Sequence, residues 1–190
     1  MHKTYQTASD AFHDLYWRIV RDGVDFAGTK ALFNVGFELE VPNANAILDS
    51  KVKRNWSYTY AEAEWQWYLS GDRNIEKLGE IYGKVPAIWK RMADEQGNVN
   101  SNYGYQWQRG YEHKSQLDYV IELLKDNPET RQAAISIYDG KEHPDYKTDT
   151  PCTYAVQFTV LDNKLNMSVV MRSNDLWYGF CNDQYQFSNL

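Results

Sequence analysis

The residues whose types and spacing are best suited to chemistry are a cysteine, Cys152, and the pair Arg172 and Ser173. They flank two apolar-rich runs, residues 153–161 and 165–171, which predict the two strands of a β-hairpin. A cation beside a thiol lowers the pKa of the thiol and makes it nucleophilic. An arginine and a serine together also suit a phosphate, through forked and single hydrogen bonds. The pattern therefore predicts a nucleophilic cysteine next to an anion-binding pair.

The register of this hairpin decides which groups face the thiol. If the turn centres on Asp162 and Asn163, the numbers of paired residues sum to about 325. Cys152 then lies opposite Ser173 and next to Arg172, and a bulge would shift this pairing by one residue. The alternative is a buried strand cysteine and a solvated strand-end arginine, because cysteine outside disulfides is among the most buried residue types.

A polar segment, residues 172–183, follows the second run and carries two acids, Asp175 and Asp183. Acids near the start of a helix are stabilised by the helix dipole, which is the structural alternative for Asp175. Asp183 lies further into the expected helix, where the alternative is a solvated helix face. The segment is dense in polar groups for a strand-to-helix junction, so we expect it to contribute to a site.

Composition limits the classes of function. A chain of 190 residues suits one domain with one sizeable core, and 7 Trp and 15 Tyr argue against disorder. The net charge of −6 makes broad binding to nucleic acid unfavourable, but a small nucleotide needs only a few local cations. Two cysteines are too few for a disulfide scaffold or a cysteine-based zinc site. With neither a signal segment nor a membrane-spanning run visible, we expect a cytoplasmic protein with reduced thiols and no metal.

Hydrophobic periodicity predicts an α+β fold, a single domain over residues 1–190 with a mixed or mostly antiparallel sheet and helices packed on it. The expected helices are 7–22, 59–70, 115–125 and one from about 175 to the end of the chain, and the expected strands are 33–41, 133–138, 153–161 and 165–171. A domain seldom stops inside an amphipathic helix without a cap or a polar tail. The sequence therefore predicts that a piece of the full protein lies beyond Leu190.

Six groups of residues resemble, in order, the motifs of the thymidylate synthase superfamily, which includes phage nucleotide hydroxymethylases. The active-site strand and the segment after it are matched by Thr150-Pro151-Cys152-Thr153, Gln157-Phe158, Arg172-Ser173, Asp175 and Gly179. The upstream motifs are matched by Glu64, Trp67, Leu69, Gly71 and Asp72, by Ile88-Trp89, Ala93-Asp94-Glu95 and Gly97, by Tyr103-Gly104 and Gln106-Trp107, and by Asn127-Pro128 with Arg131. The resemblance runs from about residue 59 to the end of the chain.

The resemblance implies a homodimer that acts on the base of a pyrimidine nucleotide, with 5,10-methylenetetrahydrofolate as the one-carbon donor. By similarity, Cys152 adds to C6 of the pyrimidine and makes C5 able to attack the donor. The other implied roles are Glu64 for water and proton transfer, Tyr103 for proton removal from C5, Arg172 and Ser173 for the 5′-phosphate, Arg131 for the phosphate in the neighbouring subunit, Gln157 for the polar network of the site, Asn182 and Asp183 for the base, and Trp89, Asp175 and Gly179 for the pterin side. The alternatives are an exposed helix acid for Glu64 and core packing for Trp89 and Tyr103.

Two departures from the synthases bear on the substrate, because this chain has Thr153 where they usually have His and Asp183 where they have Asn. Uracil presents an O4 acceptor and an N3–H donor, which match the two ends of an Asn amide. Cytosine presents an amino donor and an N3 acceptor. A carboxylate accepts from the amino group, and a proton on the carboxyl or on N3 completes the pair. Asp183 therefore favours cytosine, and the segment around it looks more like the phage deoxycytidylate hydroxymethylases.

The expected reaction is hydroxymethylation of dCMP, in which water rather than hydride completes the reaction and tetrahydrofolate is released. The alternatives are a thymidylate synthase, a hydroxymethylase of dUMP or CMP, and a non-catalytic fragment that binds pyrimidine nucleotide. Three further departures concern the phosphate and sugar. Gln132 follows Arg131 where the family usually has a second arginine, the early phosphate arginine has only Arg21 and Lys30 as candidates, and the family's sugar-binding motif would lie beyond Leu190.

Overall fold

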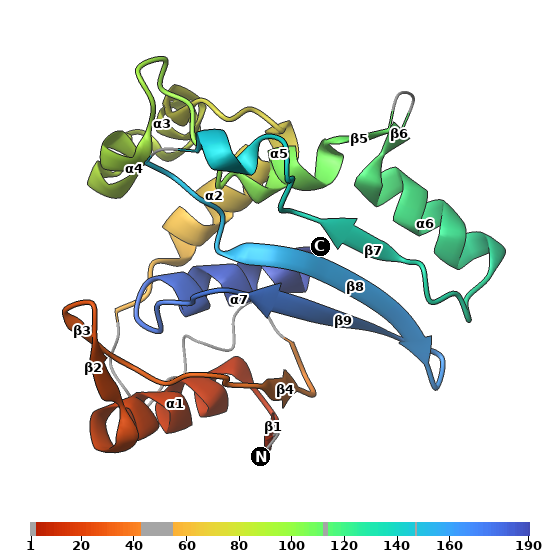
Figure 1. The fold of residues 1–190 in the computed structure, drawn as a ribbon, viewed down its shortest axis with the longest axis horizontal. Helices are drawn as coiled ribbons and strands as arrows, with labels where there is room; N and C mark the ends of the chain where they lie inside the picture. The colour runs from red at the N-terminus through yellow and green to blue at the C-terminus, as the bar shows by residue number, and fades with distance from the viewer. Residues whose placement is uncertain (1–2, 43–54, 112–113, 147) are drawn as a thin grey trace. The chain divides into compact units, whose positions relative to one another are not determined.

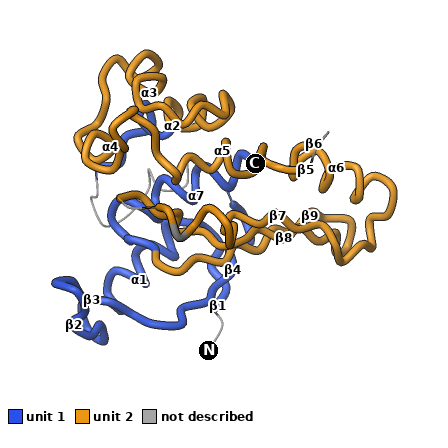
Figure 2. The backbone as a smooth tube through the Cα atoms, turned by 45° about the horizontal axis from the view of Figure 1, so that its top comes forward, with its two compact units in different colours: residues 1–61, 174–190 blue, residues 62–173 orange. Residues whose placement is uncertain are grey.

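The computed structural model describes residues 3–42, 55–111, 114–146 and 148–190. The chain divides into two compact units, which Figure 2 distinguishes by colour. Unit 1 comprises residues 1–61 and 174–190, and unit 2 comprises residues 62–173. Helices and strands do not alternate strictly, so the α+β class is confirmed, and the described strands form one small parallel sheet and three antiparallel ones.

A three-stranded antiparallel sheet organises unit 2, in the order β7-β8-β9. Its strands are β7 (Ala134–Ser136), β8 (Thr153–Leu161) and β9 (Lys164–Met171). The turn between β8 and β9 has Asp162 and Asn163 at φ values of 50° and 59°, the left-handed pair that a tight two-residue hairpin requires. The predicted hairpin and its turn are therefore confirmed.

The register of β8 and β9 follows the expected sum of 325 from Leu161 opposite Lys164 to Ala155 opposite Val170. A bulge then shifts the pairing, so that Thr153 lies opposite Met171. The backbone N–H of Arg172 consequently donates to the carbonyl of Cys152 over 2.8 Å. The bulge thus sets Arg172, and not Ser173, directly across from the cysteine.

Helices supply most of the buried aromatic residues of unit 2. Figure 1 shows α6 (Gln116–Asp126) beside β7, and the two pack together. The other helical elements of unit 2 are α2 (Tyr58–Ser70), α3 (Ile75–Tyr82), α4 (Ala87–Met92), α5 (Tyr103–Gln108) and a 3-10 turn (His143–Asp145). The first turn of α2 belongs to unit 1. The strands β5 (Gly110–Tyr111) and β6 (Lys114–Ser115) form a short antiparallel pair. At the start of α5, a Cβ on Gly104 would lie 1.7 Å from the carbonyl oxygen of Tyr68, so only glycine permits this approach to α2.

Unit 1 is built on α1 (Ala8–Asp22) and α7 (Gly179–Asn189). Thr7 caps α1 reciprocally with Asp10, which explains why the helix begins where the sequence predicts. The short strands are β1 (Lys3–Tyr5), parallel to β4 (Phe37–Leu39), and the hairpin of β2 (Val24–Phe26) and β3 (Thr29–Ala31). The ring of Phe12 on α1 packs 6.4 Å from the ring of Phe180 on α7, centroid to centroid.

Two expectations for unit 1 are corrected by the structure. The strand predicted over 33–41 forms only as β4, and the side chains of Phe33, Val35 and Val41 are exposed. The last helix begins at Gly179 instead of near Asp175, because the backbone from Asp175 forms a turn first. Among the described residues, no helix is both long enough and apolar enough to cross a membrane.

Candidate active site

Cys152 immediately precedes β8 and is half-buried, and neither cysteine of the chain forms a disulfide. The Arg172 side chain reaches back over the loop before it: Nε donates to the carbonyl of Pro151 over 3.1 Å, and Nη2 donates to the carbonyl of Thr150 over 2.8 Å. The guanidinium therefore lies against the two residues that precede the cysteine. These two bonds use two of its five N–H donors, and because the side chain is exposed, further donors remain for an anion.

Tyr138, just beyond the end of β7, belongs to the same cluster. Its hydroxyl donates to the carbonyl of Pro151 over 3.0 Å, so this carbonyl accepts from both Tyr138 and Arg172. Burial raises the pKa of Tyr138 above its ordinary value, and the nearby Arg172 guanidinium only partly opposes this effect. Tyr138 thus stays a neutral donor at pH 7 and helps to fix the loop before Cys152. No motif or spacing in the sequence indicated this role of Tyr138, which was notable only as the last residue of the predicted strand 133–138.

Glu64 and Tyr103 lie on helices of the same unit. Glu64, on α2, has only 4% of its surface exposed, so the alternative of an exposed helix acid is wrong. A carboxyl is almost never buried to this degree unless it is paired or bonded. Tyr103, the first residue of α5, is also buried, with its ring 5.7 Å from that of Tyr68. For Tyr103 the core-packing alternative therefore agrees with the geometry, and its role in proton removal stays a prediction.

Four other predicted residues of unit 2 lie on α4, on β8, between α6 and β7, and after β9. Trp89, on α4, is half-buried with its ring 5.3 Å from that of Trp67. Gln157 is exposed on β8 and Phe158 is buried, which confirms that their side chains point to opposite faces of the strand. Arg131 is exposed on the connection between α6 and β7. Ser173, the last residue of unit 2, is exposed directly after Arg172.

The polar segment that follows belongs to unit 1. The Asp175 carboxylate accepts from the backbone N–H of Tyr178 over 2.6 Å, and its carbonyl accepts from that of Phe180 over 2.7 Å. Asp175 therefore closes the turn before α7, as its structural alternative expects, and its side chain is still exposed. A Cβ on Gly179 would lie 3.5 Å from Oδ2 of Asp183, so the carboxylate of Asp183 extends along α7 toward this glycine.

Asn182, beside Asp183, is held by a residue that the sequence did not single out. The indole N–H of Trp56 donates to Oδ1 of Asn182 over 2.9 Å, and both residues belong to unit 1. Gln186 makes a second such bond, from its amide nitrogen to the carbonyl of Ala61 over 3.1 Å. These bonds fix the face of α7 that carries Asn182 and Gln186, and they leave Asp183 half-buried.

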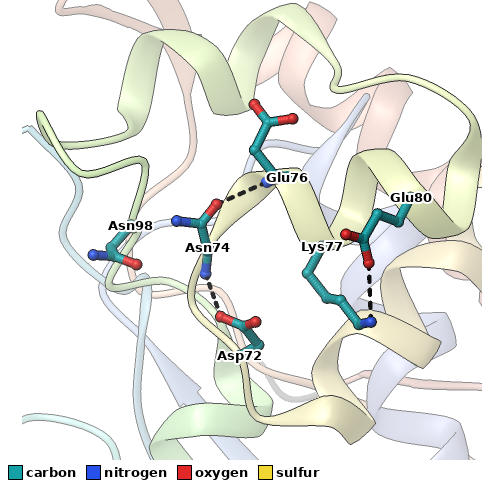
Figure 3. A pocket seen from close by; sticks show the side chains of 6 residues that line it. All are labelled: Asp72, Asn74, Glu76, Lys77, Glu80 and Asn98. Atoms are coloured by element: carbon teal, nitrogen blue, oxygen red, sulfur yellow. Dashed lines mark hydrogen bonds and ion pairs between the residues drawn. The ribbon is translucent and has the colours of Figure 1, made fainter.

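A broad hollow of about 620 Å³ lies elsewhere in unit 2, between the start of α3 and a neighbouring loop. Figure 3 shows the residues that line it: Asp72, Asn74, Glu76, Lys77, Glu80 and Asn98. Lys77 is paired with Glu80 at 3.0 Å, and the remaining acids disfavour a phosphate. None of the predicted catalytic residues lines this hollow. Within the described ranges, no group of three or more potential metal ligands is found.

Of the candidates, the structure brings Cys152 and Arg172 together in unit 2 and gathers Asp175, Gly179 and Asp183 at the start of α7 in unit 1. Lys30 lies on β3, where its amine is 3.4 Å from the Asp25 carboxylate, and the guanidinium of Arg21 is bonded to Asp22 at 2.7 Å. These contacts pair Lys30 and Arg21 with acids, and they do not connect either cation to the predicted phosphate-binding residues Arg172 and Ser173.

The chain is similar to known proteins along most of its length. The family model described as thymidylate synthase matches residues 10–190. Deoxycytidylate 5-hydroxymethyltransferase of Enterobacteria phage T4 is 35% identical over 130 residues, which are 65% of this chain and 50% of the phage protein. Thymidylate synthase of Corynebacterium aurimucosum is 31% identical over 175 residues, which are 88% of this chain and 63% of that protein. The chain thus spans about half to two thirds of the length of these relatives.

The fold is also that of a solved member. The structure of thermostable thymidylate synthase A from Bacillus subtilis superposes with a TM-score of 0.66 at 22% sequence identity, covering 96% of this chain and 70% of that one. At this level of identity the similarity establishes the fold, and the chemistry has to be argued from the residues themselves.

Proposed function

Because this chain belongs to the thymidylate synthase family, we propose that it carries out a folate-dependent one-carbon transfer to a pyrimidine nucleotide, specifically the hydroxymethylation of dCMP. The observation that carries the proposal is the pairing of Cys152 with Arg172 across the bulged end of the β-hairpin. It places the Arg172 guanidinium against the two residues that precede the half-buried Cys152. Such a cation favours the thiolate, which is the form that can add to a pyrimidine ring.

In the proposed reaction, the sulfur of Cys152 forms a bond to C6 of cytosine, and the electron pair of the C5–C6 double bond becomes available at C5. Methylenetetrahydrofolate supplies the one-carbon unit that C5 takes up. Tyr103 and Glu64 then serve proton transfer: the C5 proton leaves, the bond between the transferred carbon and the folate nitrogen breaks with release of tetrahydrofolate, and water adds to the exocyclic carbon. Departure of the Cys152 thiolate restores the aromatic ring. The balanced products are 5-hydroxymethyl-dCMP and tetrahydrofolate.

The residues assigned to the folate have chemistry that fits it. Trp89 keeps part of its ring exposed, as packing against a flat heterocycle requires, and the exposed Asp175 carboxylate can accept from ring N–H and amino groups. Gly179 allows close approach because it has no side chain. The exposed Arg172 and Ser173 keep donors for a 5′-phosphate. Gln157 and Asn182 complete the proposed polar contacts of the nucleotide.

The choice of cytosine rests on Asp183. A carboxylate accepts from the exocyclic amino group of cytosine, and it repels O4 of uracil. The similarity to the phage T4 deoxycytidylate 5-hydroxymethyltransferase supports this assignment. Thymidylate synthase is the second candidate, because the Corynebacterium synthase matches a larger share of the chain.

We further propose that the enzyme is a homodimer in which Arg131 reaches the phosphate site of the partner subunit. The exposed position of Arg131 between α6 and β7 is compatible with such a reach. The remaining alternatives are a hydroxymethylase of dUMP or CMP and a non-catalytic nucleotide-binding module, and the module predicts binding of dCMP without turnover.

The folate product separates hydroxymethylation from methylation. We expect that the protein, incubated with dCMP and methylenetetrahydrofolate, forms tetrahydrofolate and 5-hydroxymethyl-dCMP in equal amounts, because water and not hydride completes the reaction. Chromatography of the quenched mixture measures both products. Dihydrofolate together with a 5-methyl nucleotide would mark hydride transfer and would contradict the proposal in favour of the synthase reaction.

A further inference from the structure

Asp149, three residues before Cys152, is a buried acid to which the proposed reaction gives no role. Only 3% of its surface is exposed, although it lies in a loop between the 3-10 turn and β8. A carboxyl group loses much hydration when it is buried, so its oxygens must find hydrogen bonds inside the protein. The bonds that it makes therefore show what this position does.

All the described bonds of Asp149 go to one neighbouring loop. Oδ2 accepts from the backbone N–H groups of Asn100 and Ser101 over 2.5 and 2.6 Å, and Oδ1 accepts from the Ser101 hydroxyl over 2.5 Å. The Asn100 side chain returns a fourth bond, from Nδ2 to the carbonyl of Asp149 over 2.9 Å. Four hydrogen bonds therefore connect Asn100 and Ser101 to Asp149, in the loop that precedes Cys152.

Each of the two tied segments leads directly to a residue of the proposed chemistry. Ser101 is followed by Asn102, whose side chain caps α5 by accepting from Tyr105 N–H over 2.8 Å, and then by Tyr103. On the other side, Asp149 is followed by Thr150 and Pro151, whose carbonyls accept from Arg172, and then by Cys152. Asp149 thus links the segment that precedes Cys152 to the segment that precedes α5.

We propose that Asp149 is a positioning residue, which holds the backbone of Cys152 in register with the Arg172 guanidinium and with the start of α5. This inference rests on the proposed function, in which Cys152 is the nucleophile and Tyr103 serves proton removal. Asp149 itself touches neither substrate nor the reacting atoms in this account. It acts by holding the loop that carries Cys152. This placement matters because a displacement of about 1 Å at a reacting group can lower the rate about 100-fold.

An asparagine at this position separates placement from charge. Its amide oxygen can replace Oδ2 and accept from the two backbone N–H groups, and its amide nitrogen can donate to the Ser101 hydroxyl. Asp149→Asn therefore preserves the connection and removes the charge. Asp149→Ala removes both, and Ser101→Ala removes only the bond to Oδ1.

The test is the pH dependence of the rate at which iodoacetamide alkylates Cys152, followed by peptide mass spectrometry in the folded protein. In Asp149→Ala the loop loosens and the thiol moves out of register with Arg172, so the alkylation rate at neutral pH falls by about threefold or more. Asp149→Asn restores the wild-type profile. Asp145→Ala, an exposed acid four residues upstream, is the matched control and leaves the profile unchanged.

Where the protein also turns over dCMP, Asp149→Ala lowers kcat about 100-fold with little change in KM, and Asp149→Asn recovers most of the loss. If Asp149→Ala does not fold, Ser101→Ala has to show a smaller shift of the alkylation profile in the same direction. Coincident profiles for all variants would overturn the positioning role, and a shift that Asp149→Asn fails to restore would assign the effect to charge instead. Alkylation needs no substrate, so a failure of the proposed function would leave this test intact.

Discussion

Cys152→Ser is expected to reduce the turnover of dCMP by about 10⁴-fold or more while leaving nucleotide affinity within a fewfold of wild type. A serine hydroxyl is almost entirely protonated at neutral pH, so it cannot add to C6 as a thiolate does. Binding should survive because Arg172 is held by the backbone carbonyls of Thr150 and Pro151, which the substitution does not alter. Steady-state kinetics and calorimetric titration with dCMP measure the two quantities.

The second cysteine provides the control for this substitution. Cys181 is fully buried on α7, with its sulfur 3.8 Å from the carbonyl of Leu176. Cys181→Ser keeps a donor of similar size there, and folded protein should retain most of its turnover. If Cys152→Ser kept more than about a hundredth of the wild-type kcat, the covalent mechanism would be ruled out for this chain.

Asp183→Asn is expected to change the ratio of kcat/KM for dCMP to that for dUMP by at least about 100-fold, in favour of dUMP. The amide donates to O4 of uracil and accepts from its N3–H, whereas the carboxylate matches the amino group of cytosine. The change is large because a site built to bond one edge leaves its own polar groups unpaired against the other.

Parallel kinetics with the two nucleotides measure this ratio for wild type and variant. Asp126→Asn, at the exposed end of α6, makes the same chemical change far along the chain and should leave the ratio as it is. An unchanged ratio in Asp183→Asn would remove the physical reason for choosing cytosine, although it would leave the family and the nucleophile untouched.

The hairpin that carries the cysteine could be predicted from sequence because its determinants are local. Alternation of residues along β8 and the Asp162-Asn163 turn fix both strands, and the register follows from the turn by counting. The bulge at the far end could be allowed for but not located. It decides that Arg172, and not Ser173, faces Cys152, so a shift of one residue changes which group accompanies the thiol.

The strand predicted over 33–41 forms only over Phe37–Leu39, for a reason that alternation cannot reveal. A strand needs a partner of matching length, and β1, to which β4 pairs, is only three residues long. Phe33 instead packs against Phe26 of the β2 hairpin, with ring centroids 5.2 Å apart. Short helices such as α3 and α4 were missed because six to eight residues give too few turns for a periodic pattern.

The hydrogen bonds that hold the site residues in place could not be predicted from the sequence, because they join residues far apart in the chain. Asp149 bonds Asn100 across 49 positions, and Trp56 bonds Asn182 across 126. No spacing rule connects such pairs before the fold is known. The residues proposed to carry the chemistry stand within motifs that the sequence shows, whereas the residues that hold them are defined only by their contacts.

The most direct test of the central claim is the release of tritium from [5-³H]dCMP, run beside [5-³H]dUMP, with and without methylenetetrahydrofolate. Loss of the C5 proton requires prior activation of C5, which in this account comes from addition of Cys152 to C6. We predict release that depends on folate, occurs with dCMP in preference to dUMP, and disappears in Cys152→Ser. Release from dUMP alone would contradict the substrate assignment, and no release from either nucleotide would contradict catalysis by this chain.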